Sequence, residues 1–117
     1  MELLLSCTND GPVTVVDARG DIDALSAPAL QERLEMHIAA GQRHLVIDLS
    51  GVGFMDSTGL GVLVGRLKAV RQLGGVLHCV VTTDRIRRIF LATGLERVLP
   101  LHETVDEAVA AVTELPS

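Results

Sequence analysis

Short apolar runs rich in β-branched residues alternate with amphipathic stretches along this chain, and this alternation limits the fold more than any other feature. The clearest run covers residues 44–49 and is almost continuously apolar, as expected of a central strand covered on both faces. Residues 57–73 follow, with apolar side chains at helical spacing and charged side chains between them. The pattern predicts an α/β protein.

A β-hairpin is predicted at the start of the chain. Residues 3–7 and 13–18 are predicted strands, because the turn-forming residues 9–12 separate them. A hairpin followed by alternating strands and helices predicts a mixed central β-sheet of about 4–5 strands, with about four α-helices packed against it. The length of 117 residues and the 48% hydrophobic content fit one domain spanning residues 1–117.

The remaining elements are predicted from capping residues, apolar stripes and glycines at helix ends. Helices are expected from the cap Ser26 to about Ala40, from Ser57 to Leu73, from the cap Asp84 to Gly94, and onward from a capping box at Thr104–Glu107. Further strands are expected at residues 76–81 and 98–99, and the tail 115–117 is expected to fray.

The composition argues against several classes of function. A net charge of -5 gives no positive field for a phosphate backbone, and 2% aromatic residues leave little to stack on bases or sugars, so no direct nucleic-acid partner is expected. Cys7 and Cys79 lie in apolar stretches, as buried free cysteines do. The N-terminus lacks the features of a signal peptide and the apolar stretches are too short to span a bilayer, which predicts a cytoplasmic protein without a membrane partner.

The most unusual segment is residues 51–61, GVGFMDSTGLG, which links the apolar run to the amphipathic stretch. Asp56 or Ser57 is expected to cap the helix, because free N–H groups and the helix dipole favour an oxygen acceptor there. Capping does not explain Gly59 and Gly61, since glycine inside a helix costs about 1 kcal/mol relative to alanine. Either these glycines expose the backbone to an anion, a phosphoryl group or a partner, or they let the helix pack tightly on the sheet.

Three enzymatic motifs do not fit this segment. A serine-hydrolase elbow needs glycine where Met55 stands. A dinucleotide loop fails because the glycines after Gly59 are one residue out of register, and Gly65 is not followed by the lysine of a P-loop. We therefore expect no catalytic residue, no cofactor and no metal.

Other polar residues suggest sites only weakly. Two carboxylates in residues 20–23 have neither the spacing nor the third ligand of a cation site, so turn chemistry is expected unless this loop lies beside Ser57. The four histidines are scattered and receive no function. A basic region around the third helix is either a solvated face or a contact for an acidic partner, and comprises Arg85, Arg87, Arg88 and Arg97.

Residues 54–63, FMDSTGLGVL, resemble the signature of bacterial anti-sigma factor antagonists, which are STAS-domain proteins. The resemblance extends to residues 20–23, 88–90 and 93–95 and so covers nearly the whole chain. The overall sequence pattern is similar to that of actinobacterial members of the family. The resemblance implies a STAS fold. In that family the serine directly after the aspartate is phosphorylated, and that serine is Ser57 here.

The resemblance also implies a regulator of transcription that catalyses nothing. The unphosphorylated chain would bind an anti-sigma factor that is also a serine kinase, with ATP bound by that partner, and would release a sigma factor. Phosphorylation of Ser57 would break the complex, and a PP2C-type phosphatase would restore it. The expected partner-binding residues are Asp23, Asp56, Ser57, Thr58, Gly59 and Gly61, with Thr58 a weaker candidate for phosphorylation.

The sequence leaves two other hypotheses about function open. The chain could be a small enzyme or nucleotide-binding protein that uses the helix start at Ser57 as an anion site. It could also be a constitutive scaffold subunit of a larger sensory complex, with the same fold and stable oligomers.

Overall fold

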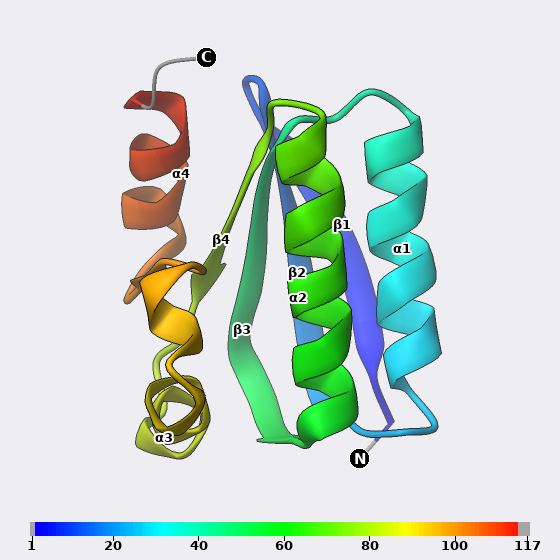
Figure 1. Cartoon of the computed structure of the whole chain (residues 1–117), viewed down its shortest axis with the longest axis vertical. Coiled ribbons are helices and arrows are strands. Elements are labelled where there is room, and N and C mark those ends of the chain that lie inside the picture. The colour runs from blue at the N-terminus through cyan, green and yellow to red at the C-terminus, as the bar shows by residue number, and fades with distance from the viewer. Residues whose placement is uncertain (1, 115–117) are drawn as a thin grey trace.

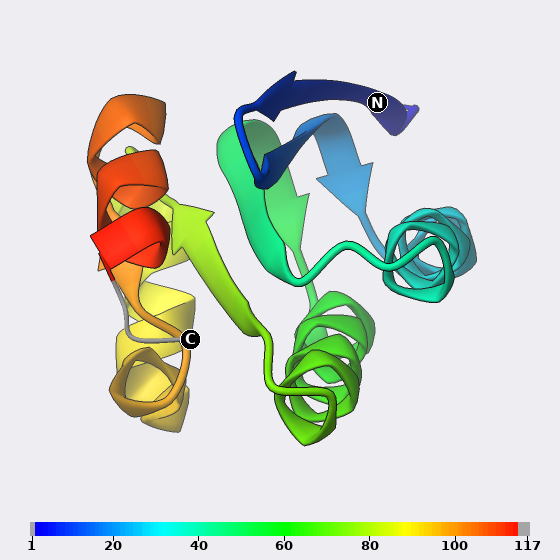
Figure 2. The same cartoon turned by 90° about the horizontal axis from the view of Figure 1, so that it is seen from above.

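The computed structural model describes residues 2–114 and shows one β-sheet with helices on both of its faces (Figures 1 and 2). The strands are β1 (Leu4–Asp10), β2 (Val13–Ile22), β3 (His44–Met55), β4 (Val76–Val80) and β5 (Leu101–His102). The helices are α1 (Ala27–Ala39), α2 (Ser57–Gln72), α3 (Asp84–Thr93) and α4 (Val105–Glu114). The strands lie in the order β1-β2-β3-β4-β5. β1 is antiparallel to β2 and the other neighbours are parallel, so the predicted fold class is confirmed.

The opening hairpin is confirmed, but its second strand is longer than predicted. Gly11 turns the chain with a φ of 59°, a left-handed conformation that glycine adopts without strain. β2 continues beyond Ala18 because Gly20 accepts a φ of 113° beside two shifts in the β2–β3 register. A β-carbon on Gly20 would collide with the carbonyl oxygen of Glu2. This glycine therefore lets the strand run on to Ile22.

β3 also extends beyond the predicted residues 44–49. Its second half pairs with the second half of β2, ending with Ile22 opposite Met55. The ends of β2 and β3 consequently lie side by side at one end of the sheet, where α2 begins (Figure 1).

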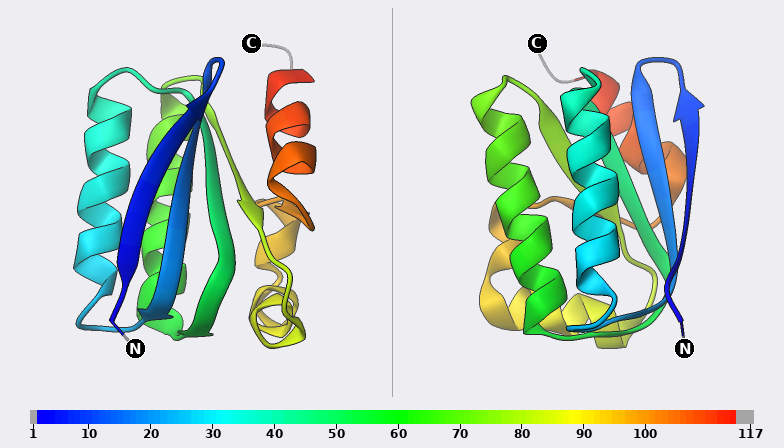
Figure 3. Two further views of the ribbon diagram at one scale, coloured as in Figure 1. Left: turned by 180° about the vertical axis from the view of Figure 1, so that it is seen from behind. Right: turned by 90° about the vertical axis from the view of Figure 1, so that its right-hand side faces the viewer.

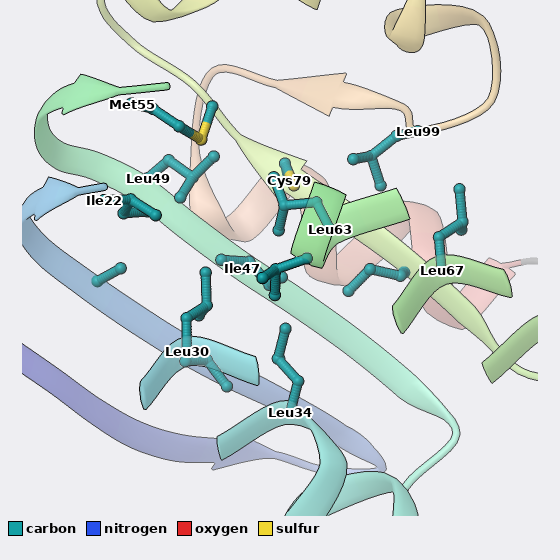
Figure 4. Close-up of a cluster of buried hydrophobic side chains, with 14 of the residues drawn as sticks. Ile22, Leu30, Leu34, Ile47, Leu49, Met55, Leu63, Leu67, Cys79 and Leu99 are labelled. Atoms are coloured by element: carbon teal, nitrogen blue, oxygen red, sulfur yellow. The ribbon is translucent and has the colours of Figure 1, made fainter. Parts of the chain in front are cut away.

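A large apolar core lies between the sheet and α1, α2 and α3. Figure 4 shows the part of it between the sheet and the helices α1 and α2. The core holds the apolar stripes of α1 and α2 and, from α3, Ile86 and Phe90. A smaller core lies on the opposite face, where Ala108 and Val112 of α4 pack on valines of β2, β3 and β4. Figure 3 shows β1 at the outer edge of the sheet, away from α3 and α4. Within residues 2–114, no helix combines the length and the apolar character needed to cross a membrane.

Two predicted helix caps differ from the structure in different ways. Ser26 is the N-cap residue of α1 as predicted, but its hydroxyl makes no capping bond and instead donates to the Asp21 carbonyl oxygen at 2.8 Å. Asp84 is the first residue of α3, and the capping position belongs to Thr83, whose side chain makes no cap bond. One of the two hydrogen bonds of the predicted capping box forms: Thr104 Oγ1 accepts the Glu107 N–H at 3.1 Å.

The predicted strand at residues 98–99 is also wrong. Residues Leu95–Arg97 form a short 3-10 helix, and the last strand forms at Leu101–His102, where the backbone pairs with Cys79 and Val80. Cys79 is buried as expected, whereas Cys7 on the edge strand is half-buried. The expected fraying of residues 115–117 lies outside the described residues.

Candidate functional site

The segment 51–61 forms the end of β3 and the first turns of α2. Asp56 is the residue that caps α2, because its extended backbone precedes the helix and its carboxylate accepts the Thr58 N–H at 2.9 Å. The Asp56 carbonyl oxygen also accepts the Leu60 N–H at 3.3 Å. The choice between Asp56 and Ser57 is therefore resolved in favour of Asp56.

Ser57 is the first residue of α2 and is exposed. Its hydroxyl makes no hydrogen bond within residues 2–114, because Asp56 already supplies the capping acceptor. Thr58 is exposed as well, but its N–H is committed to Asp56. The site thus presents an unengaged serine hydroxyl at the positive end of a helix.

The loop between β2 and α1 is folded around the carboxylate of Asp23. Asp23 Oδ1 accepts the N–H groups of Leu25 and Ser26, each at 3.0 Å. The Ser26 hydroxyl lies 3.1 Å from the same oxygen. The N–H of Ser26 has the largest effect and lowers the pKa of Asp23. Desolvation opposes it, and the Ser26 hydroxyl and the Leu25 N–H then contribute to keeping the pKa below its usual value. Asp23 is thus a charged side chain with a defined position.

The end of β2, just before this loop, is hydrogen-bonded to the residue that caps α2. The Asp56 N–H donates to the Ile22 carbonyl oxygen at 3.2 Å. Asp23 directly follows Ile22 and Ser57 directly follows Asp56, so each lies one residue from that hydrogen bond. The expected loop at residues 20–23 is wrong for residues 20–22, which belong to β2. The structure nevertheless brings Asp23, directly after β2, close to Ser57, which sequence spacing alone left open.

Gly59 and Gly61 have different surroundings. Gly59 is buried, and a β-carbon there would lie 2.7 Å from Ile22 Cγ2 and 2.8 Å from Met55 Cγ. Gly61 is exposed, and a β-carbon there would meet nothing within 4 Å. Close packing explains Gly59, whereas Gly61 leaves a bare patch of helix surface near Ser57.

Two apolar residues of this region were missed by the sequence analysis. Leu25 is 93% exposed at the tip of the β2–α1 loop, and Phe54 is 46% exposed near the end of β3. Exposed apolar side chains beside polar ones are typical of protein-binding surfaces. Neither residue belongs to an apolar stripe. Phe54 begins the motif at residues 54–63, but only the fold shows that both side chains are exposed beside Ser57.

The hollow beside this loop does not suit a nucleotide. It has a volume of about 470 Å³ and includes Glu2, Asp21 and Asp23 among its lining residues, with no Lys or Arg. Carboxylates disfavour the approach of a polyphosphate. The residues described also contain no group of three or more His, Cys, Asp or Glu that could hold a metal ion.

His78 and His102, to which no function was assigned, meet on the face of the sheet that α4 covers. Nδ1 of His78 lies 2.9 Å from Nε2 of His102, and the two rings are stacked. Burial, and secondarily the charge of His102, lower the pKa of His78 to about 4. The pair could not be foreseen because 24 residues separate its members and only the pairing of β4 with β5 joins them.

Similar proteins of known family indicate what kind of protein this chain is. The STAS domain family model matches residues 6–108. The anti-sigma-B factor antagonist of Staphylococcus aureus is 36% identical over 103 residues, which cover 88% of this chain and 95% of that protein. The Listeria monocytogenes anti-sigma-B factor antagonist is 41% identical over 88 residues, covering 75% of this chain and 77% of that protein.

Solved structures give the same result. An anti-sigma factor antagonist from Mycobacterium paratuberculosis superimposes with a TM-score of 0.91 at 32% identity, covering 97% of this chain and 96% of that one. SpoIIAA of Bacillus in its phosphorylated form has a TM-score of 0.72 at 21% identity, with 94% of this chain and 98% of that chain covered, which shows a shared fold.

The fold and the match over most of the chain define a STAS-domain protein, and the chain belongs to that family. Within it, the relatives at 32–41% identity are anti-sigma factor antagonists, and the chain belongs to this group. These relatives are regulatory binding proteins rather than enzymes, so the recognised family and the non-enzymatic class are both confirmed.

Proposed function

We propose that this chain is a single STAS domain that binds an anti-sigma factor with serine kinase activity and thereby frees a sigma factor. The kinase transfers the γ-phosphoryl group of its own ATP to the Ser57 hydroxyl, which loses its proton, and ADP leaves. The phosphorylated chain then dissociates, and a PP2C-type phosphatase hydrolyses the phosphoserine. Because a sigma factor acts in transcription, the chain works in the cytoplasm.

The observation that carries this proposal is the unengaged, exposed hydroxyl of Ser57 at a helix start that another residue caps. A serine that supplied the cap itself would have to give up that bond before it could react. The identity of the relatives as anti-sigma factor antagonists supports the choice of partner. The phosphorylated SpoIIAA structure supports a fold that tolerates the added group.

Electrostatics explain how the phosphate would act as a switch. It adds about -1.5 to -2 charge at pH 7. In the free protein the positive end of α2 offsets part of this charge. At a protein interface the same phosphate lies close to the carboxylates of Asp56 and Asp23, where like-charge repulsion and desolvation weaken binding. No refolding is needed.

The test compares the wild type, Ser57→Ala and Ser57→Asp with each anti-sigma kinase of the host. Wild type and Ser57→Ala are expected to bind with similar affinity, and Ser57→Asp to bind at least about ten-fold more weakly because it mimics part of the phosphate charge. Isothermal titration calorimetry measures the affinities. Equal affinity for all three proteins would contradict the electrostatic switch.

A second measurement locates the phosphate. After incubation with the kinase and ATP, peptide mass mapping is expected to find phosphate on Ser57 in the wild type and none in Ser57→Ala. Thr58→Ala is the matched control, because it changes the adjacent exposed hydroxyl and should leave phosphorylation of Ser57 intact. Phosphate on another residue, or on none with every host kinase, would refute the assignment.

A further inference from the structure

The outer face of α3 concentrates positive charge in an acidic chain. Three of the ten Lys and Arg residues lie within four positions, while the whole chain has a net charge of -5. Exposed helix faces commonly carry charged residues for solvation alone, usually with both signs present. On α3 only Arg87 has a carboxylate partner, Asp84 at 3.0 Å. The excess of one sign therefore needs a separate explanation.

Arg85 and Arg88 are the unbalanced charges. Both side chains are exposed, and neither forms an ion pair within residues 2–114. Residues three apart on a helix are neighbours on one face, so the two guanidinium groups form a single patch. Leu91, three residues further on, is 53% exposed and extends the patch with an apolar side chain.

The patch borders the site at Ser57. Arg85 Nη1 donates to the Gly53 carbonyl oxygen at 3.4 Å, and Gly53 lies in β3 beside the half-exposed Phe54. Figure 1 shows α3 on one side of the start of α2 and the β2–α1 loop on the other. Charge around Ser57 is thus divided, with carboxylates on the α1 side and guanidinium groups on the α3 side.

We propose that Arg85 and Arg88, with Phe54, form a second contact region for the partner that binds at Ser57, and that they receive an acidic patch on that partner. This inference rests on the proposed function. Opposite charges speed association and exclude wrong orientations. Two regions of opposite sign on either side of Ser57 allow only one orientation of the partner over the hydroxyl. A nucleic acid suits the patch poorly, because the carboxylates nearby repel a phosphate backbone.

The test uses the double variant Arg85→Glu/Arg88→Glu and a control that reverses one charge far from Ser57, Lys68→Glu. Lys68 is exposed on α2, eleven residues and about 16 Å along the helix from Ser57, and forms no ion pair within residues 2–114. Surface plasmon resonance gives the association rate constant with the host anti-sigma kinase. Single-turnover assays give kcat/KM for phosphorylation of Ser57. Circular dichroism verifies that each variant is folded.

For the double variant, both quantities are expected to fall about ten-fold or more at low salt, and the loss should shrink at about 0.5 M salt, where charges are screened. Lys68→Glu should stay within about two-fold of the wild type. If the double variant matches Lys68→Glu while the wild type is phosphorylated normally, the α3 contact is overturned and the proposed function stands. If the wild type binds no host anti-sigma kinase, both are overturned.

Discussion

Gly59 and Gly61 are two residues apart in α2, yet they illustrate different uses of the same residue. The side chains of Ile22 and Met55 leave no room for a β-carbon at Gly59, whereas the space around Gly61 is open. Packing therefore accounts for the first glycine and not for the second. The bare surface at Gly61 is consistent with a partner that approaches the helix near Ser57.

Alanine substitutions separate these two uses. Gly59→Ala is expected to lower the free energy of unfolding by up to about 2 kcal/mol, because overpacking costs about 1–3 kcal/mol and the gain in helix propensity offsets about 1 kcal/mol of that. Gly61→Ala is expected to raise it by up to about 1 kcal/mol, since only the propensity changes. Urea unfolding measures both. Shifts in the same direction would contradict the distinction.

At the scale of elements, the start of α2 depends on Asp56. Its carboxylate satisfies the Thr58 N–H and its negative charge lies at the positive end of the helix. Its N–H donates to Ile22, which ties the end of β2 to the same point. The cap thus holds the helix, two strand ends and the exposed serine in one arrangement.

Removing the cap tests this role. Asp56→Ala is expected to lower the free energy of unfolding by about 0.5–2 kcal/mol, and Asp56→Asn by less, because asparagine keeps an acceptor. Ser57→Ala should change stability little, since the hydroxyl has no partner within residues 2–114. Thermal unfolding provides the measurement. A loss with Ser57→Ala equal to that with Asp56→Ala would mean that the serine shares the capping role.

At the scale of the whole molecule, the candidate site and the histidine pair lie apart. The site is at the end of the sheet where β2 and β3 stop, while the face under α4 holds the His78–His102 pair. The folded protein keeps His78 neutral to a lower pH than the unfolded chain does, because the pKa is about 4 in the fold and about 6.5 in an unfolded chain. Proton binding therefore favours unfolding.

The sign of the resulting pH dependence follows from linkage. Stability should be unaffected by His78 above pH of about 6.5, should fall as the pH drops from there, and should level off below about 4. One pKa unit corresponds to about 1.4 kcal/mol, so the loss is at most about 3–4 kcal/mol. Urea unfolding at several pH values measures it. His78→Gln should flatten the curve, whereas His44→Gln, at the start of β3, should leave it in place. An unchanged curve for His78→Gln would refute the assignment.

The sequence alone determined the order and type of nearly all elements and the segment that holds the candidate site. Periodicity located the buried strand and the four helices, because apolar spacing reflects which face an element buries. The motif at residues 54–63 located Ser57. Both are local properties of the chain, and neither depends on which segments meet in space.

Only the tertiary structure decided which residues surround Ser57 and what each contributes. β2 and β3 run past their predicted ends because each supplies the other with backbone partners, and that pairing brings Ile22 against Asp56. The exposure of Leu25, the reach of Arg85 to Gly53 and the meeting of His78 with His102 also follow from strand order and helix placement. Contacts between residues far apart in the chain leave no periodic signal, so they cannot be read from the sequence.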